Sequence, residues 1–228
     1  MSDPDPSADA TRRQLLDRLT RTGLYLITDD HLDEATLLDR LNAALAAGAD
    51  VVQFRDKRAD RVAVEQTGRR VAEACRAAGA LFIVNDDAEL AAALDADGVH
   101  VGQDDAPPST ARAIIGPRKL IGLSVSHLPE AAAAAADPDV DHIGFGALFL
   151  TPTKPDAEPA GPEMLAEARK VYRAPIVGIG GITPANLGQA FAAGADSVGV
   201  VSAVFSAPDA GQATRELLAA IEQARQPR

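Results

Sequence analysis

Tryptophan is missing from this sequence, and cysteine occurs once, at Cys75. A single cysteine excludes an internal disulfide and a zinc site built from cysteines, a pattern typical of proteins in a reducing cytoplasm. Basic residues are also scarce, since 22 Lys and Arg stand against 33 Asp and Glu and leave a net charge of −11. This balance lacks the positive surface that nucleic-acid binding requires, and an anionic membrane would repel it.

Long apolar runs are absent as well. No stretch of the sequence approaches the roughly 20 residues needed to cross a bilayer. The first residues also lack the basic and apolar regions of a signal peptide. We therefore expect a cytoplasmic protein that binds neither nucleic acid nor membranes. The chain does have 46% hydrophobic residues in a length of 228, which is enough for the core of one closed β/α barrel.

From residue 24 onward, short apolar stretches alternate with stretches rich in Ala, Leu, Glu and Arg, which predicts alternating strands and helices. The expected strands are 24–28, 51–55, 81–84, 98–101, 120–124, 142–145, 176–178 and 197–201. The expected helices are 35–47, 61–78, 89–94, 109–115, 129–136, 161–172, 185–193 and 209–224. Strands that are apolar throughout indicate a parallel sheet covered on both faces. Eight such units favour a single (β/α)8 TIM barrel over a doubly wound sheet, which usually has fewer strands.

A short charged amphipathic segment precedes this repeat. Residues 11–21 predict a leading N-terminal helix that packs against the barrel. Residues 1–10, rich in Ser, Asp, Pro and Ala, are expected to be disordered, and residues 225–228 are expected to fray. The expected catalytic domain is therefore 11–224.

In TIM barrels the catalytic side chains gather at the carboxyl ends of the strands. Gln53, Arg55 and Lys57 alternate along the end of the second strand, so they share one face, with Phe54 and Asp56 on the other. An amide, a guanidinium and an ammonium group on one face would bind a polyanion. A solvated strand end is the alternative interpretation.

Carboxylates follow the next two strands, in the sequences NDD at 85–87 and QDD at 103–105. One carboxylate from each neighbouring strand end could share an ion. A set of oxygen ligands predicts magnesium, which takes one or two carboxylates together with substrate phosphates and water. Helix capping is the alternative, and Asp87 or Asp104 could serve it.

The sequences GIGGI at 178–182 and VGVVSA at 198–203 end the seventh and eighth strands, where many barrels bind phosphate through backbone N–H groups. Tight turns are the alternative explanation for these glycines. The longest loop, 146–160, carries hydroxyls and a lysine at 151–154 and three prolines, which suggests a lid over the site, or else an ordinary surface loop. No Ser-His-Asp set is evident, and His100 is expected to be a hydrogen-bonded structural histidine.

Taken together, these segments resemble the thiamine-phosphate synthase (thiamine-phosphate pyrophosphorylase) family. The resemblance runs in order from about residue 24 and rests on LYLITDD at 24–30, VVQFRDK at 51–57, VNDD at 84–87, GVHVGQDD at 98–105, GLSVS at 122–126, TPTKPDA at 151–157, IGGI at 179–182 and VVSA at 200–203. This sequence departs from the family at GALF (146–149), where Gly-Pro usually precedes Phe. It also has Phe54 and Asp56 where Leu and Glu are common.

The resemblance implies a TIM-barrel transferase that uses Mg²⁺. It would condense 4-amino-2-methyl-5-hydroxymethylpyrimidine diphosphate with 4-methyl-5-(2-hydroxyethyl)thiazole phosphate, giving thiamine phosphate and pyrophosphate. Loss of pyrophosphate would leave a carbocation that the thiazole nitrogen attacks. Such a reaction needs charge neutralisation and positioning rather than a general base.

The resemblance also assigns roles to the positions that match its motifs. Its residues for the pyrimidine diphosphate are Gln53, Phe54, Arg55, Asp56, Lys57, Asn85, Ser124 and Lys154. Of these, the ones implied to be catalytic are Arg55, Lys57, Ser124 and Lys154. The residues implied for the thiazole phosphate are Thr151, Pro152, Thr153, Gly181, Val201 and Ser202. Asp86 and Asp105 would ligate the magnesium ion.

Two other functions remain open at this point. A thiazole tautomerase of the same barrel family would catalyse a proton transfer, with His127 as a conceivable acid or base. A non-catalytic regulator would bind thiamine phosphates. The diphosphate-binding residues argue against the tautomerase, and the two magnesium carboxylates argue against the regulator. The sequence leaves open whether the chain forms a homo-oligomer.

Overall fold

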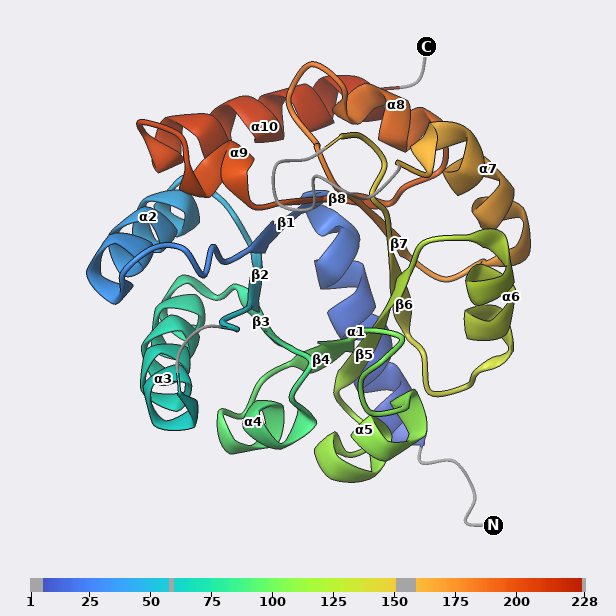
Figure 1. Cartoon of the computed structure of the whole chain (residues 1–228), viewed down its shortest axis with the longest axis horizontal. Coiled ribbons are helices and arrows are strands. Elements are labelled where there is room, and N and C mark those ends of the chain that lie inside the picture. Colours follow the sequence, from blue (N-terminus) through green and yellow to red (C-terminus); the bar gives the residue numbers. More distant parts are fainter. Residues whose placement is uncertain (1–5, 58–59, 151–158, 227–228) are drawn as a thin grey trace.

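Eight parallel strands close into a barrel in the computed structural model, which describes residues 6–57, 60–150 and 159–226. Each strand pairs with the next one in the chain, and the last pairs with the first, for example Leu24 with Val198 (Figure 1). The strands are β1 (Leu24–Ile27), β2 (Val51–Phe54), β3 (Leu81–Asn85), β4 (Gly98–Val101), β5 (Leu120–Val125), β6 (His142–Phe145), β7 (Ile176–Ile179) and β8 (Ser197–Val200). The predicted (β/α)8 TIM barrel is confirmed.

Helices surround this barrel as an outer ring (Figure 1). They are α2 (Glu34–Ala46), α3 (Arg61–Ala78), α4 (Ala88–Ala93), α5 (Pro108–Ile115), α6 (Leu128–Ala136), α7 (Gly161–Val171), α8 (Leu187–Ala192), α9 (Ser202–Phe205) and α10 (Ala210–Arg225). Aspartate side chains begin several of them by accepting a backbone N–H bond, as Asp33 does for α2 and Asp209 for α10. The four-residue α9 was not expected from the sequence, because a single turn is too short to show a helical period.

The leading helix α1 (Pro6–Arg21) lies across the amino-terminal end of the barrel (Figure 1). Leu15 and Leu19 pack there against side chains that start the strands, such as Leu81 and Leu120. Helix α1 begins at Pro6 rather than at residue 11, so residues 6–10, expected to be disordered, are helical. Helix α1 therefore covers the amino-terminal end of the barrel, and the residues that follow the strands lie at the opposite end.

Alternate residues of each strand enter two different parts of the core. Leu24, Leu26 and Phe54 pack outward in the layer between the barrel and the helices. Tyr25 and Ile27 pack inward in the barrel interior. Both faces of the strands are therefore covered, which explains why they are apolar throughout.

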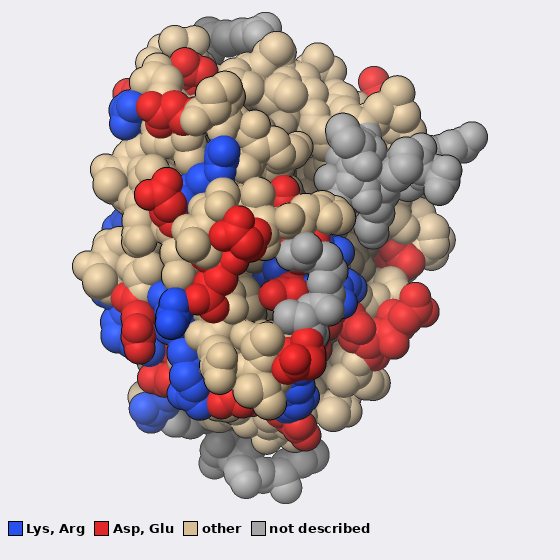
Figure 2. Space-filling model, turned by 60° about the vertical axis from the view of Figure 1, so that its left-hand side comes forward, with Lys and Arg blue, Asp and Glu red and all other residues tan. Residues whose placement is uncertain are grey.

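The described residues contain no helix that is long and apolar enough to cross a membrane. On the face of the molecule that carries α2 and α3, acidic and basic side chains are intermixed (Figure 2). Several of them form ion pairs, such as Arg61 with Asp87 at 3.1 Å and Arg70 with Glu34 at 2.5 Å. This mixture differs from the uniformly positive face of a nucleic-acid binder.

Candidate active site

The carboxyl ends of β2 and β3 bring two of the predicted residues into direct contact. The buried Gln53 side chain donates from Nε2 to Oδ1 of Asn85, at 2.6 Å. This bond occupies the carbonyl oxygen of Asn85, so its amide NH₂ group is the end that can donate to an anion. Phe54, between Gln53 and Arg55, points outward into the core as the alternation predicted.

The two cations that follow β2, Arg55 and Lys57, are both paired with carboxylates. Nη1 of Arg55 lies 2.8 Å from Oδ2 of Asp30, which follows β1. Nζ of Lys57 lies 2.8 Å from Oδ2 of Asp86, which follows β3. The Lys57 side chain is 55% exposed, whereas that of Arg55 is 29% exposed. The lysine is therefore the more accessible of the two cations.

Asp86 has an unusual backbone for a residue with a side chain, with φ at +65°. Its N–H group donates to the carbonyl oxygen of His100 at 2.7 Å, which ties the end of β3 to β4. Burial raises the pKa of Asp86 above its ordinary value. The nearby carboxyl of Asp105 raises this pKa further, whereas Lys57 acts to lower it.

Asp86 and Asp105 thus form a pair of neighbouring carboxylates from two adjacent strand ends. Asp105 is exposed, and its Oδ2 accepts a bond from the N–H of Gly102 at 2.7 Å. A divalent cation would relieve the repulsion between two such carboxylates, and Mg²⁺ binds oxygen ligands of this kind. The pair therefore fits the magnesium ion that the family resemblance implies.

The neighbouring Asp87 has a different role. Its Oδ1 accepts a bond from the N–H of Leu90 at 2.8 Å and begins helix α4. The capping interpretation therefore applies to Asp87.

The end of β5 contributes Ser124, which is exposed and is contacted by one residue of β4 and by one that follows β4. Its Oγ lies 3.1 Å from Nε2 of His100, and its carbonyl oxygen accepts a bond from Nε2 of Gln103 at 2.6 Å. Burial lowers the pKa of His100 to about 4, so the imidazole is neutral near pH 7. The prediction of a hydrogen-bonded structural histidine agrees with this geometry. The sequence had assigned no contact to Gln103.

The backbone after β7 requires a glycine at position 181. Its φ is +65°, and a Cβ atom there would lie 2.4 Å from the carbonyl oxygen of Leu150 and 2.9 Å from Cβ of Phe149. Asn186 fastens the same turn by donating from Nδ2 to the carbonyl oxygen of Gly181 at 2.8 Å. The alternative that this glycine serves a tight turn therefore holds, whether or not phosphate also binds here.

Val201 and Ser202 lie at the neighbouring strand end. Ile179 of β7 and Gly199 of β8 are register partners, so Gly181 and Val201 each follow that pair by two residues. Ser202 is exposed and begins the short α9. The chain thus places these three predicted residues on adjacent connections at the carboxyl ends of the strands.

The remaining predicted residues, Thr151, Pro152, Thr153 and Lys154, lie outside the described residues. The flanks of this segment are described. Phe149 donates its N–H to the carbonyl oxygen of Gly180 at 3.0 Å, and Ala160 donates to that of Ala147 at 2.8 Å. The lid interpretation remains a prediction.

A family model described as thiamine monophosphate synthase matches residues 24–204. The matched range starts at β1, contains all eight strands and includes every described site residue considered above. The chain belongs to this family.

Named relatives of the thiamine monophosphate synthase family agree with this assignment. The chain is 44% identical over 215 residues to thiamine-phosphate synthase of Roseiflexus castenholzii, an alignment that covers 93% of this chain and 94% of that protein. It is 45% identical over 206 residues to the bifunctional protein ThiM/ThiE of Symbiobacterium thermophilum; that match covers 90% of this chain but only 42% of the longer relative.

A solved structure, thiamine phosphate pyrophosphorylase from Pyrococcus furiosus, superposes with a TM-score of 0.83 at 35% identity. The alignment covers 91% of this chain and all of that one (100%). The predicted family is therefore confirmed, and the names of these relatives are those of a transferase.

Proposed function

We propose that this chain is a thiamine-phosphate synthase. It would condense the aminopyrimidine diphosphate with the thiazole phosphate named above and release thiamine phosphate and pyrophosphate. In a chain of this family, one observation carries the proposal. Side chains suited to bind an anion lie next to a pair of carboxylates suited to bind a cation, at adjacent strand ends. Nζ of Lys57 lies 2.8 Å from Oδ2 of Asp86.

The pyrimidine diphosphate would bind over the ends of β2 to β5. Arg55 and Lys57 would neutralise the diphosphate oxygens, the amide of Asn85 would donate to it, and Ser124 would contribute its hydroxyl. These local donors are needed because the chain as a whole carries a net charge of −11, which repels both substrates. Gln53 would hold Asn85 in place through the 2.6 Å bond between them.

Asp86 and Asp105 would hold Mg²⁺, which supplies charge neutralisation for the departing pyrophosphate. Lys57 is paired with Asp86 in the structure. Use of Asp86 as a metal ligand would release the ammonium group of Lys57 toward the diphosphate. The protein's contribution to the reaction is to place the reacting atoms together and to stabilise charge on the leaving group.

The thiazole phosphate would bind near the ends of β7 and β8, through Gly181, Val201 and Ser202. Thr151, Pro152 and Thr153 of the adjoining loop would complete this subsite, and Lys154 would contact the diphosphate. Phe54 and Asp56 belong to the diphosphate-binding segment, although Phe54 would act only through the backbone. An enzyme of this kind would work in the cytoplasm on small molecules.

A tautomerase would need a positioned acid or base, and the geometry of His127 does not favour that role. Its Nδ1 accepts a bond from the N–H of Glu130 at 3.4 Å, and its Nε2 lies 3.5 Å from Oε1 of the same residue. The imidazole therefore caps helix α6 through Nδ1.

The test is to incubate the purified chain with both substrates and Mg²⁺ and to measure thiamine phosphate and pyrophosphate. We expect the two products in equal amounts and no turnover when either substrate is omitted. Isomerisation of a thiazole substrate without condensation would indicate the tautomerase. Binding of thiamine phosphate with no turnover would indicate a regulator, and either result would reject the proposal.

A further inference from the structure

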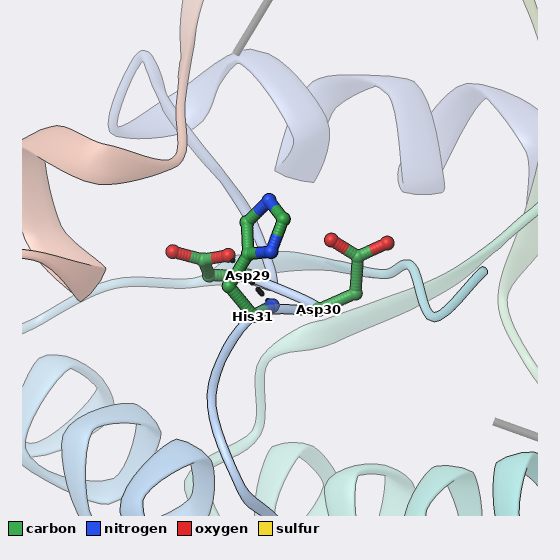
Figure 3. Close-up of side chains that lie close together, drawn as sticks. All are labelled: Asp29, Asp30 and His31. Atoms are coloured by element: carbon green, nitrogen blue, oxygen red, sulfur yellow. Dashed lines mark hydrogen bonds between the residues drawn. The ribbon is translucent and has the colours of Figure 1, made fainter. Parts of the chain in front are cut away.

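The end of β1 carries two adjacent carboxylates with different environments. Figure 3 shows the side chains of Asp29 and Asp30 on opposite sides of the His31 ring. Asp29 accepts a bond from the N–H of His31 at 3.0 Å and thereby closes a local turn. Asp30 is 8% exposed and extends toward the end of β2. Asp30 contacts the residues that follow β2, Arg55 and Lys57.

Asp30 contacts the segment after β2, from Arg55 to Lys57, through a single carboxylate oxygen. Its Oδ2 lies 2.8 Å from Nη1 of Arg55 and also accepts a bond from the backbone N–H of Lys57 at 3.3 Å. A charge-assisted bond to a guanidinium is directional as well as strong. One buried carboxylate oxygen therefore sets the direction of the Arg55 side chain and the course of the chain leading to Lys57.

The Thr28 side chain forms hydrogen bonds with the backbone of Arg55. The N–H of Arg55 donates to Oγ1 of Thr28 at 2.8 Å, and this hydroxyl donates to the carbonyl oxygen of Arg55 at 2.9 Å. β2 ends at Phe54, so these bonds replace the sheet pairing that Arg55 has lost. Arg55 is thus held at both backbone and side chain by residues that follow β1.

A cation site at this place is the competing interpretation. One ligand atom from each of Asp29, Asp30 and His31 lies within 4.8 Å of the others. The charge of Asp30, however, is already balanced by the Arg55 guanidinium, whose Nη1 lies 2.8 Å from Oδ2 of Asp30. Nothing else in the described residues points to an ion there, so Arg55 is the partner that explains Asp30.

We propose that Asp30 is a positioning residue for the proposed reaction, which orients the Arg55 guanidinium toward the diphosphate. The inference rests on the proposed function, because it assumes that Arg55 contacts that ligand. Without Asp30, the guanidinium would turn toward solvent or another carboxylate, and a displacement of about 1 Å can cost up to a hundred-fold in rate.

The experiment is a double-mutant cycle of Asp30→Asn and Arg55→Gln, with Asp29→Asn as the matched control. We expect Asp30→Asn to lower kcat about ten-fold while the KM for the thiazole phosphate changes less than about two-fold. In the Arg55→Gln protein, Asp30→Asn should have no further effect. Asp29→Asn should behave like the wild type, since Asp29 only closes its own turn.

The same four proteins are titrated with inorganic pyrophosphate and Mg²⁺ by calorimetry. We expect Asp30→Asn to weaken pyrophosphate binding about ten-fold in the Arg55 background and not in the Arg55→Gln background. If the effects of Asp30→Asn and Arg55→Gln on pyrophosphate binding simply add in the double variant, the proposal is overturned. Tighter binding would also overturn it, since Asp30 would then only compete with the anion for Arg55.

Two controls keep the outcome interpretable. If Asp30→Asn does not fold, the cycle is run with Asp30→Glu, which keeps the charge but shifts it by one methylene group. The pyrophosphate titration does not depend on turnover. A wild-type chain that binds pyrophosphate without condensing the substrates would reject the proposed function, while the titration would still decide the role of Asp30.

Discussion

At the scale of single residues, neighbouring aspartates in this protein have different environments. Asp86 faces Lys57 and Asp105, whereas Asp87 caps a helix. We predict that Asp86→Asn lowers kcat about a hundred-fold, because it removes one of the two charges that would hold the metal. The fold should survive, since Asn also tolerates the backbone φ of +65° found at this position.

The matched control for this prediction is Asp87→Asn, since asparagine also caps helices well. Activity of both variants is measured over a series of Mg²⁺ concentrations. Equal activity of the two at limiting Mg²⁺ would remove Asp86 from the metal site.

Gly181 permits a second test at the same scale. Gly181→Ala should lower the free energy of unfolding by about 2–4 kcal/mol, because it adds a close contact with the carbonyl oxygen of Leu150 to the strain of a positive φ. Gly79→Ala is the control: its φ is +68°, but a Cβ atom there would meet nothing within 4 Å. Urea unfolding of both variants measures the difference, and equal losses would contradict the explanation by close contact.

At the scale of elements, α1 precedes the repeat and covers the amino-terminal end of the barrel. Leu19 is fully buried there, and the carbonyl oxygen of the same residue accepts a bond from Oγ of Ser197 at 3.1 Å. We predict that Leu19→Ala lowers the free energy of unfolding by about 2–5 kcal/mol, since it leaves a cavity beneath the barrel.

The exposed Arg13 of the same helix supplies the control, because Arg13→Ala should change the free energy of unfolding by less than about 0.5 kcal/mol. Steady-state activity should be unchanged in both variants below their melting temperatures. A small effect of Leu19→Ala would mean that α1 contributes little to the stability of the barrel.

At the scale of the whole molecule, closing the barrel brings two histidines from different strands together in its interior. The ring centroids of His100 and His142 lie 5.5 Å apart. Burial lowers the pKa of His100 to about 4, and burial together with His100 holds the pKa of His142 well below its usual range. Both rings are therefore neutral in the folded protein near pH 7.

This pair predicts a loss of stability in acid. Above the ordinary histidine pKa of 6.5 neither ring contributes, because both states are neutral. As the pH falls below 6.5 the unfolded chain binds protons that the folded chain does not, so the free energy of unfolding decreases. For His100 alone the loss is about 3 kcal/mol by pH 4.

The measurement is urea unfolding between pH 7 and pH 4.5 for the wild type, His142→Phe and His31→Phe. We expect a shallower pH dependence in His142→Phe, which removes one of the two buried titrating rings. The exposed His31 is the control and should leave the slope unchanged. Parallel slopes in all three proteins would show that the buried histidines do not cause the loss.

The alternation of strands and helices was determined by the sequence itself. Strands such as 98–101 and 142–145, and the helix 61–78, were predicted with the bounds that the structure has, because each depends on the periodicity of neighbouring residues. The residues that follow each strand could also be identified from the sequence alone. A barrel brings the carboxyl ends of all its strands to one end, so the sequence also predicted that these residues lie there.

Only the tertiary structure decided which of these groups act on each other. Asp30 and Arg55 are 25 residues apart in the chain, and nothing between them indicates that this aspartate, rather than Asp29, pairs with the arginine. Gly181 is required by the approach of residues 149–150, which return from a different strand. Pairings of this kind depend on side-chain direction and on the closure of the barrel, and both are set by contacts between segments that are distant in the sequence.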